Sequence, residues 1–163
     1  MEAETKDDLH VGEIRITTFL RIVRLAKDLP LPRYQSDGAA GLDLHAAEER
    51  LALHPGSIWS CPTGIVVEIP RGFVGLIRPR SGISARFGVT MISSGVIDAD
   101  YRGQVHVPLI NHGDSPVRIG FGERVAQMLV MPVATCKIIE VERVEDLTAT
   151  ARGERGFGST GRQ

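Results

Sequence analysis

The chain has 163 residues, of which 42% are hydrophobic and 24% are charged, so it is long and apolar enough to form one folded domain. Its formal net charge of -1 excludes the broad positive field on which sequence-independent binding of nucleic acid depends. No apolar run reaches the roughly 20 residues that span a bilayer, and the polar, acidic start MEAETKDDLH is not typical of a targeting segment. We therefore expect a cytoplasmic protein with no nucleic-acid or membrane partner.

Short apolar segments, many with period-two alternation, dominate the chain, and turn-forming pairs such as Pro55-Gly56 and Gly113-Asp114 separate them. Many short strands at this spacing are typical of an all-β sandwich or a closed β structure. The predicted strands, in chain order, are Ile14–Leu25, Leu42–Ala46, Ser57–Trp59, Gly64–Ile69, Phe73–Arg78, Val89–Ile92, Gln104–Asn111, Val117–Ile119, Arg124–Pro132 and Thr135–Val141.

Helical character is confined to two segments. Ser81–Phe87 predicts one or two turns with Ser81 as the N-cap, and a further turn is predicted near Arg143–Leu147. Residues 1–13 are expected to be disordered, and residues 149–163, with four glycines and one aromatic residue, to form a flexible tail. Two cysteines 75 positions apart favour buried thiols in a reducing compartment over a single disulfide.

Five blocks rich in glycine or charge interrupt the strands. In AGLDL, alternation turns Asp43 away from the apolar side, where it could orient metal-bound water or an arginine. In PRSG, Arg80, the Ser81 hydroxyl and the Gly82 amide would converge at a helix N-terminus, which suits phosphate. In GVIDADYRG, flanking apolar residues should shield Asp98 in part, which raises the pKa of a carboxyl group and suits a general base.

The last two blocks lie nearer the C-terminus. In GERVAQM, Arg124 and Gln127 could reach phosphate or tie down a neighbouring loop. In RGERGFGSTG, backbone amides could surround a polyanion, Arg152 and Arg155 supply charge, and Phe157 offers a flat face to a base. Ordering about ten residues costs on the order of 10 kcal/mol, so this tail should close only over a ligand that contributes contacts.

Each block also fits a purely structural role. These roles are a solvated strand residue for Asp43, a turn and helix cap for PRSG, an Asp-rich hairpin turn for GVIDADYRG, a turn and buried strand for GERVAQM and a solvated tail for RGERGFGSTG.

Taken together, in this order and spacing, the five blocks resemble the five motifs of the trimeric dUTPases (deoxyuridine 5'-triphosphate nucleotidohydrolases) from about Leu20 to Gly161. The resemblance implies an all-β, jelly-roll-like β-barrel with one short helix, over residues 14–148, and a C-terminal tail, residues 149–163, that closes the active site. It also implies a homotrimer in which each site is shared among subunits: Asp98 from one, PRSG from a second and the tail from a third.

The same resemblance implies hydrolysis of dUTP to dUMP and pyrophosphate with Mg²⁺ as cofactor, which limits uracil incorporation into DNA and supplies dUMP for dTMP synthesis. Asp98 would be the catalytic base for a water that attacks the α-phosphate, and Asp43 would touch the metal through water. The implied substrate-binding residues are Arg80, Ser81, Gly82, Ser93, Gly95, Val96, Ile97, Tyr101, His106, Gln127, Arg152, Phe157, Gly158, Ser159 and Thr160.

The sequence departs from the family pattern near the base. The hairpin between Gly88 and Gly95 is one residue shorter than in many bacterial members, and Ile92-Ser93-Ser94 replaces the stretch that holds their uracil-reading asparagine. Arg155 stands where the family usually has glycine. His106 occupies a position from which the family contacts substrate, although a plain outward-facing strand residue fits equally well.

Two other functions fit the same scaffold. A dCTP deaminase would carry a catalytic glutamate in the strand QVHVPLIN, but Pro108 stands at that point and cannot transfer a proton. A non-catalytic nucleotide sensor or a purely structural trimer could lose Asp98, Arg80 or the tail, and this chain retains all of them. We therefore favour the hydrolase.

Overall fold

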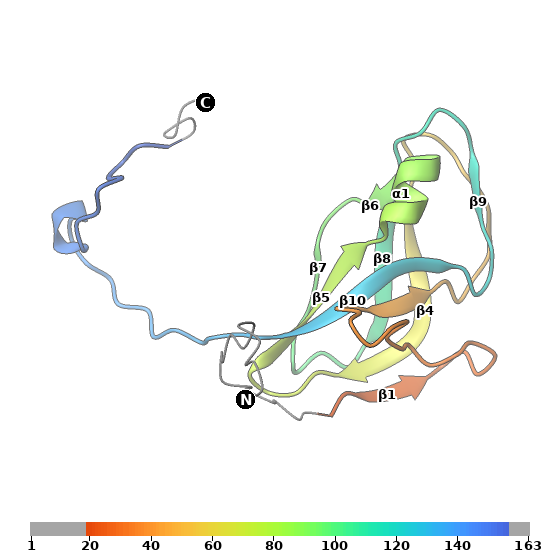
Figure 1. Ribbon diagram of the computed structural model, residues 1–163, viewed down its shortest axis with the longest axis horizontal. Helices are drawn as coiled ribbons and strands as arrows, with labels where there is room; N and C mark the ends of the chain where they lie inside the picture. Colours follow the sequence, from red (N-terminus) through yellow and green to blue (C-terminus); the bar gives the residue numbers. More distant parts are fainter. Residues whose placement is uncertain (1–18, 157–163) are drawn as a thin grey trace, which may run out of the picture. The chain divides into compact units, whose positions relative to one another are not determined.

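The computed structural model describes residues 19–156, which form ten strands, one α-helix and one 3₁₀ helix (Figure 1). The elements are β1 (Arg21–Arg24), β2 (Leu42–His45), β3 (Arg50–Leu53), β4 (Ile58–Glu68), β5 (Phe73–Pro79), α1 (Ser81–Phe87), β6 (Val89–Met91), β7 (Gly95–Ile97), β8 (Gln104–Asn111), β9 (Val117–Ile119), β10 (Arg124–Pro132) and η1 (Val144–Asp146).

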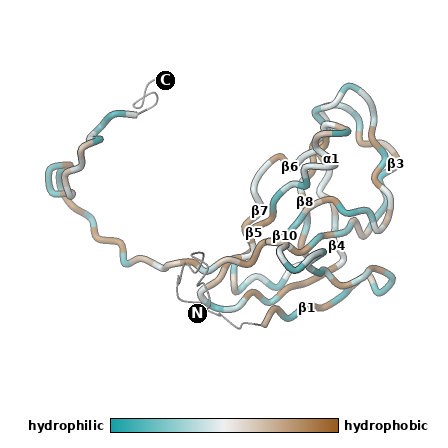
Figure 2. The backbone as a smooth tube through the Cα atoms, viewed as in Figure 1, coloured by the Kyte–Doolittle hydropathy of each residue, from teal (hydrophilic) through white to brown (hydrophobic). Residues whose placement is uncertain are grey.

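The strands pair antiparallel in two four-stranded sheets and one ribbon. The first sheet has the order β1-β4-β8-β6, the second has the order β2-β10-β5-β7, and β3 pairs with β9. Apolar residues recur along the strands, whereas the turns that join them are largely hydrophilic (Figure 2). The alternating residues that face inward form one core, in which Leu44, Ile77, Val107 and Met128 are fully buried.

The predicted all-β class with one short helix is confirmed. The expected architecture is a jelly-roll-like β-barrel. Within the described residues the sheets remain separate, so the arrangement is jelly-roll-like but is not a closed barrel. The helix Ser81–Phe87 has the predicted bounds, but its N-cap is Arg80. The prediction that Ser81 caps the helix is therefore wrong, because Ser81 is already its first helical residue.

Several strand predictions need correction. Ser57–Trp59 and Gly64–Ile69 are parts of one long strand, β4, because Gly64 adopts a positive φ of 67° and lets the chain continue through an irregular pairing with β8. Sequence reasoning missed β3 and β7. Thr135–Val141 is not a strand in the described chain, and the predicted turn near Arg143–Leu147 is confirmed as η1.

The chain divides into two compact units, Met1–Val133 and Ala134–Gln163, and the sheets all belong to the first. The predicted boundary at residue 148 stays a prediction.

Cys61 is buried and Cys136 is exposed, both as free thiols, so the expectation of two buried thiols is wrong for Cys136. Burial raises the pKa of the Cys61 thiol to about 12. Within residues 19–156, neither helix has the length and apolar character that crossing a membrane requires.

The end of α1 is held by a close approach between two glycines. Gly88 closes the helix with φ of 69°, and its amide donates to the Ser84 carbonyl. A Cβ atom at Gly88 would lie 2.6 Å from the amide nitrogen of Gly113, in the turn after β8. The Asn111 carboxamide fixes that turn, because its Oδ1 accepts from the Gly113 amide at 2.8 Å.

We predict that Gly88→Ala lowers the free energy of unfolding by about 2–4 kcal/mol, because the added methyl group both strains the left-handed backbone and overlaps Gly113. Urea denaturation at matched protein concentration measures the change. Gly120→Ala is the control: a Cβ there meets nothing within 4 Å, and its effect should stay within about 0.5 kcal/mol. Equal stability of the two variants would contradict the argument.

Candidate active site

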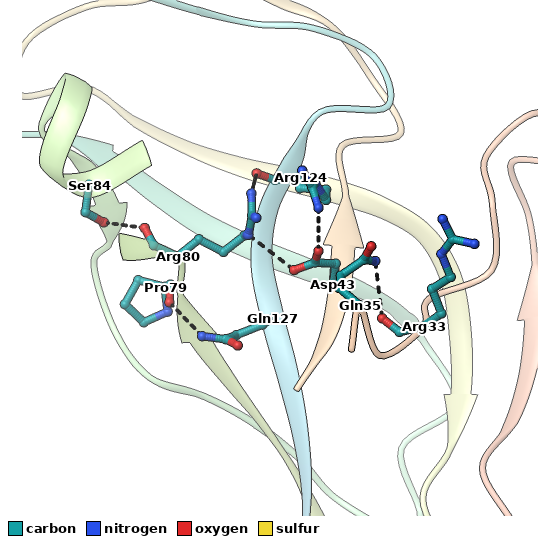
Figure 3. Close-up of polar contacts among 8 residues, drawn as sticks. All are labelled: Arg33, Gln35, Asp43, Pro79, Arg80, Ser84, Arg124 and Gln127. Carbon is teal, nitrogen blue, oxygen red and sulfur yellow. Dashed lines mark hydrogen bonds and ion pairs between the residues drawn. The ribbon is translucent and has the colours of Figure 1, made fainter. Parts of the chain in front are cut away.

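A buried carboxylate joins three elements at one end of the second sheet. Asp43 in β2 pairs with Arg80, just before α1, at 3.2 Å, and with Arg124 at the start of β10 at 3.1 Å (Figure 3). Each carboxylate oxygen takes one guanidinium, and Arg80 also donates to the Arg124 carbonyl at 3.2 Å. The result is a local pair of cations with fixed positions around one anion.

The side chain of Asp43 is 9% exposed, whereas those of Arg80 and Arg124 are 30% and 45% exposed. The interpretation of Asp43 as a solvated strand residue is therefore wrong, because the guanidinium groups cover most of its carboxylate. Burial lowers the pKa of the neighbouring His45; Asp43 opposes this shift, and Arg124, Arg80 and Arg33 add to it.

Gln127 in β10 lies beside this cluster, opposite Asp43 on one side and Arg78 on the other. Its Nε2 donates to the Pro79 carbonyl at 3.4 Å (Figure 3). A Cβ atom at Gly41 would lie 2.8 Å from Oε1 of Gln127, so the glycine of AGLDL makes room for this amide.

A pocket of about 250 Å³ opens beside the cation pair. Arg80, Gly82, Arg124 and Glu123 line it together with apolar residues and Arg86 of α1. Ser81 and Gly82 are both exposed at the first turn of the helix. The structure thus brings the PRSG and GERVAQM blocks together, next to Asp43 of the AGLDL block.

The GVIDADYRG segment forms β7 and a tight turn. The Tyr101 amide donates to the Asp98 carbonyl at 3.2 Å, so residues 98–101 reverse the chain. Ile97 is buried, but Val96 and Asp98 are exposed. The expectation that Val96 helps to draw Asp98 out of water is therefore wrong within this chain, because β7 ends at Ile97 and the carboxylate follows it into the turn.

Tyr101 lies across the end of that turn. Its hydroxyl donates to the Gln104 carbonyl at 3.0 Å, and its ring covers Gly103 so closely that any larger residue there would collide with it. Asp98, Tyr101, Gln104 and His106 line a second pocket of about 250 Å³, together with β7 and Ile77. The ring nitrogen Nδ1 of His106 lies 3.3 Å from the Ser60 hydroxyl. His106 is thus both outward-facing and part of the pocket that holds Asp98.

The remaining predicted residues divide into three groups. Gly95, Val96 and Ile97 line the second pocket, and Ser93 is exposed in the loop that precedes them. In the second unit, Arg152 is exposed, and its Nε donates to the Arg155 carbonyl at 2.9 Å. Phe157, Gly158, Ser159 and Thr160 lie outside the described residues.

Sequence reasoning did not assign Arg124 and Gln104 to the site. From the sequence, Arg124 could either reach phosphate or tie down a neighbouring loop. Only the β2–β10 pairing shows that it reaches Asp43. Gln104 follows the Asp98 turn directly, but a strand pattern alone does not place its side chain beside a pocket. Among the described residues, no three acidic, histidine or cysteine side chains gather as a metal site.

We predict that Asp43→Asn lowers the free energy of unfolding by about 1–3 kcal/mol, because it leaves Arg80 and Arg124 without their shared anion while both keep partial access to water. Urea denaturation measures the loss. Asp37→Asn removes an exposed carboxylate from the loop before β2 and should stay within about 0.5 kcal/mol of the natural chain. A loss no larger than that of Asp37→Asn would show that the ion pairs contribute nothing.

Comparisons with known proteins show the family of this chain. The family model described as dUTPase matches residues 27–161. A deoxyuridine 5'-triphosphate nucleotidohydrolase of Anaeromyxobacter sp. is 50% identical over 143 residues, which cover 87% of this chain and 95% of that protein. Another from Rhizobium rhizogenes is 49% identical and covers 87% and 93%.

The solved structures agree as well. The dUTPase of Staphylococcus bacteriophage 80alpha with dUpNHpp superposes with a TM-score of 0.82 at 30% identity, over 89% of this chain and 99% of that one. A mutant dUTPase of phage phi11 of S. aureus, whose structure concerns a structural Mg(II) ion, has a TM-score of 0.73 at 25% identity and covers 78% and 99%. The chain belongs to the dUTPase family.

Proposed function

We propose that this protein hydrolyses dUTP to dUMP and pyrophosphate. The observation that carries the proposal is the pocket in which Asp98, Tyr101 and His106 meet the β7 backbone, within residues 27–161 that the family model matches. The two relatives that are 50% and 49% identical to this chain are named deoxyuridine 5'-triphosphate nucleotidohydrolase, which is the name of this activity. By limiting the dUTP pool, the reaction would limit uracil incorporation into DNA and supply dUMP for dTMP synthesis.

Asp98 is the general base in this proposal. Its carboxylate accepts a proton from a water molecule, whose oxygen then attacks the α-phosphorus. The bond from the α-phosphorus to the oxygen that bridges the α- and β-phosphates breaks, and pyrophosphate leaves with that electron pair. The exposure of Asp98 leaves room for both the water and the substrate next to it.

The phosphate chain is bound by the cationic pocket. Arg80 is anchored by Asp43 yet keeps part of its guanidinium exposed, so it can offer fixed donors to phosphate oxygens. The exposed Ser81 hydroxyl, the Gly82 amide and the Gln127 carboxamide add neutral donors. Such preorganised donors stabilise the charge that develops on the phosphates during attack.

Mg²⁺ fits this site as an ion that arrives with the triphosphate. The described residues lack a cluster of three ligands, and Mg²⁺ commonly binds through substrate phosphates with only one or two carboxylates. Each oxygen of Asp43 has a second lone pair, so it can accept from a metal-bound water as well as from its arginine. When bound, the metal would neutralise phosphate charge.

Three subunits share each site in this proposal. Among the described residues, the pocket beside Arg80 and the pocket beside Asp98 have no lining residue in common, as expected if two chains supply them. In the second unit, Ile138 and Ile139 are 93% and 74% exposed, an apolar surface that a homotrimer could cover.

The base and sugar would bind in the Asp98 pocket. Tyr101 would pack against the deoxyribose, and the segment Ser93–Ile97 with His106 would face the uracil.

The tail, residues 149–163, would close the site through Arg152, Phe157, Gly158, Ser159 and Thr160, and the family match includes it as far as residue 161. We assign residues 14–148 to the catalytic domain; the expected extension, residues 1–13, lies outside the described residues. The two free thiols support the cytoplasm as the compartment.

We predict that the natural chain releases pyrophosphate from dUTP with Mg²⁺ at least about tenfold faster than from dCTP, dTTP or UTP, because the pocket selects both base and sugar. Asp98→Asn should lower kcat by about 10²–10⁴ while retaining nucleotide binding, since it keeps the shape of the side chain and removes the base. Pyrophosphate release and isothermal titration with dUpNHpp measure the two effects.

Asp100→Asn is the matched control, since Asp100 is an exposed carboxylate of the same turn with no assigned role. It should retain most of the turnover. Normal turnover by Asp98→Asn would place the base elsewhere. Ammonia release from dCTP would identify a deaminase, and binding of dUTP without turnover by the natural chain would identify a sensor.

Shared sites predict complementation between inactive subunits. Asp98→Asn and Arg80→Ala should each be inactive alone, but random mixed trimers should recover about a quarter of the active sites, because Asp98 and Arg80 come from different chains. Activity after co-refolding measures the recovery. Mixing Asp98→Asn with the double variant Asp98→Asn/Arg80→Ala should restore nothing. Absence of recovery in the first mixture would place both groups in one chain.

A further inference from the structure

Arg78 is a charged residue in the middle of the second sheet that none of the roles above uses. It lies in β5, two residues before Arg80, and its side chain is exposed while its neighbours Ile77 and Gly75 are buried. Strand pairing places it opposite Gln127 of β10, and Gln127 is opposite Asp43 of β2. The three side chains therefore form a polar row across three strands on one face of the sheet.

The row continues into the loop before β7. Nη1 of Arg78 donates to the Ser94 hydroxyl at 3.2 Å. Because Ile77 is the strand partner of Gly95, Arg78 stands at the position where the β5–β7 pairing gives way to the loop Ile92–Ser94. The bond thus extends the attachment of the loop to β5 beyond the last paired residue.

Two further contacts hold the ends of the same loop. The Ile92 amide donates to the Pro108 carbonyl of β8 at 3.0 Å. A Cβ atom at Gly95 would lie 3.1 Å from Ile77, so the backbone of Gly95 packs directly on β5. Arg78 supplies the side-chain tie between these two anchors. Ser93 is the residue between the tied positions.

This loop leads into the wall of the Asp98 pocket. Gly95, Val96 and Ile97 line the pocket immediately after Ser94, and Asp98 follows them. A displacement of Ser94 is therefore passed along three residues of backbone to both the pocket wall and the carboxylate. Backbone amides and carbonyls can read the edge of a base only if the wall is held in register.

We propose that Arg78 is a positioning residue for base selection: through Ser94 it holds the loop Ile92–Ser94, and with it the β7 wall of the pocket, in the register that accepts uracil. This inference rests on the proposed dUTP hydrolysis and deepens it. It explains how the loop Ile92–Ser94 keeps a defined shape next to the pocket. Arg78 itself does not touch the base in this scheme.

The position of Arg78 in the polar row also permits direct contact between its guanidinium and the triphosphate. The two roles differ in their dependence on Ser94. A tie through Ser94 requires both partners and affects selection between bases. A direct phosphate contact requires only the cation and affects all nucleoside triphosphates alike, because they share the phosphate chain.

The test compares Arg78→Met, Ser94→Ala and the double variant with the natural chain. For each we would measure kcat/KM for dUTP, dCTP and dTTP. We expect each single variant to lower the preference for dUTP by about tenfold, the effect of losing one charge-assisted hydrogen bond. The double variant should equal either single variant, because the two residues act as one unit. Arg78→Lys, which keeps a donor, should restore part of the preference.

Hydrogen exchange of the amides in residues 92–96 gives a readout that does not depend on turnover. Exchange should be faster in Arg78→Met and Ser94→Ala than in the natural chain, and the urea midpoint should change little because the bond is exposed. Ser57→Ala, at a serine immediately before β4, provides the control and should leave both exchange and preference unchanged.

Three outcomes would overturn the role of Arg78. These are an unchanged preference with normal activity in Arg78→Met, a uniform rise in KM for all nucleotides with no effect of Ser94→Ala, and unchanged exchange in residues 92–96. Failure of the natural chain to release pyrophosphate from dUTP would overturn the proposed function instead, and the exchange measurement would still report on the tie itself.

Discussion

Asp43 places an anion where the start of β10, the end of β5 and β2 converge, and the cationic side of the site depends on it. Arg80 and Arg124 belong to segments that are 44 residues apart in the chain, and their like charges would repel without the carboxylate between them. The same ion pairs hold Arg80 in one orientation while part of its guanidinium stays accessible. Structural support and preparation for a polyanionic ligand are therefore two effects of one interaction.

Glycines set the geometry around this anchor by permitting close contacts. Gly41 makes room for the amide of Gln127, Gly103 for the ring of Tyr101, and Gly95 for the packing of β7 on Ile77. At each of these sites the neighbour is a residue that we place in, or next to, the substrate pockets. These three glycines thus admit a neighbouring side chain close to the backbone, where a Cβ atom would collide with it.

The two pockets are separate in the described chain, and this separation shapes the proposed mechanism. Arg80, Gly82 and Arg124 line one pocket, and Asp98 and Tyr101, the proposed base and the proposed sugar contact, line the other. A substrate that needs both sets of groups would be hydrolysed only when subunits assemble. Arg78 and Ser94 join β5, which ends beside the first pocket, to the loop that precedes the wall of the second pocket.

The all-β class, the bounds of α1 and the five motifs could be predicted from the amino-acid sequence, because strand alternation, turn residues and motif spacing are local properties of the chain. Eight of the predicted site residues line the two pockets: Arg80 and Gly82 line the first, and Gly95, Val96, Ile97, Asp98, Tyr101 and His106 line the second. The burial of Asp43 as an ion-pair partner could not be predicted in this way, since its environment comes from Arg80 and Arg124, which the fold brings to it from distant parts of the chain. The tertiary structure likewise exposed Asp98 and Val96 and merged two predicted strands into β4, because burial and register depend on which distant segments pack together. Arg78 had no local signal beyond a charge in an apolar strand, and its role became visible only when β7 was placed beside β5.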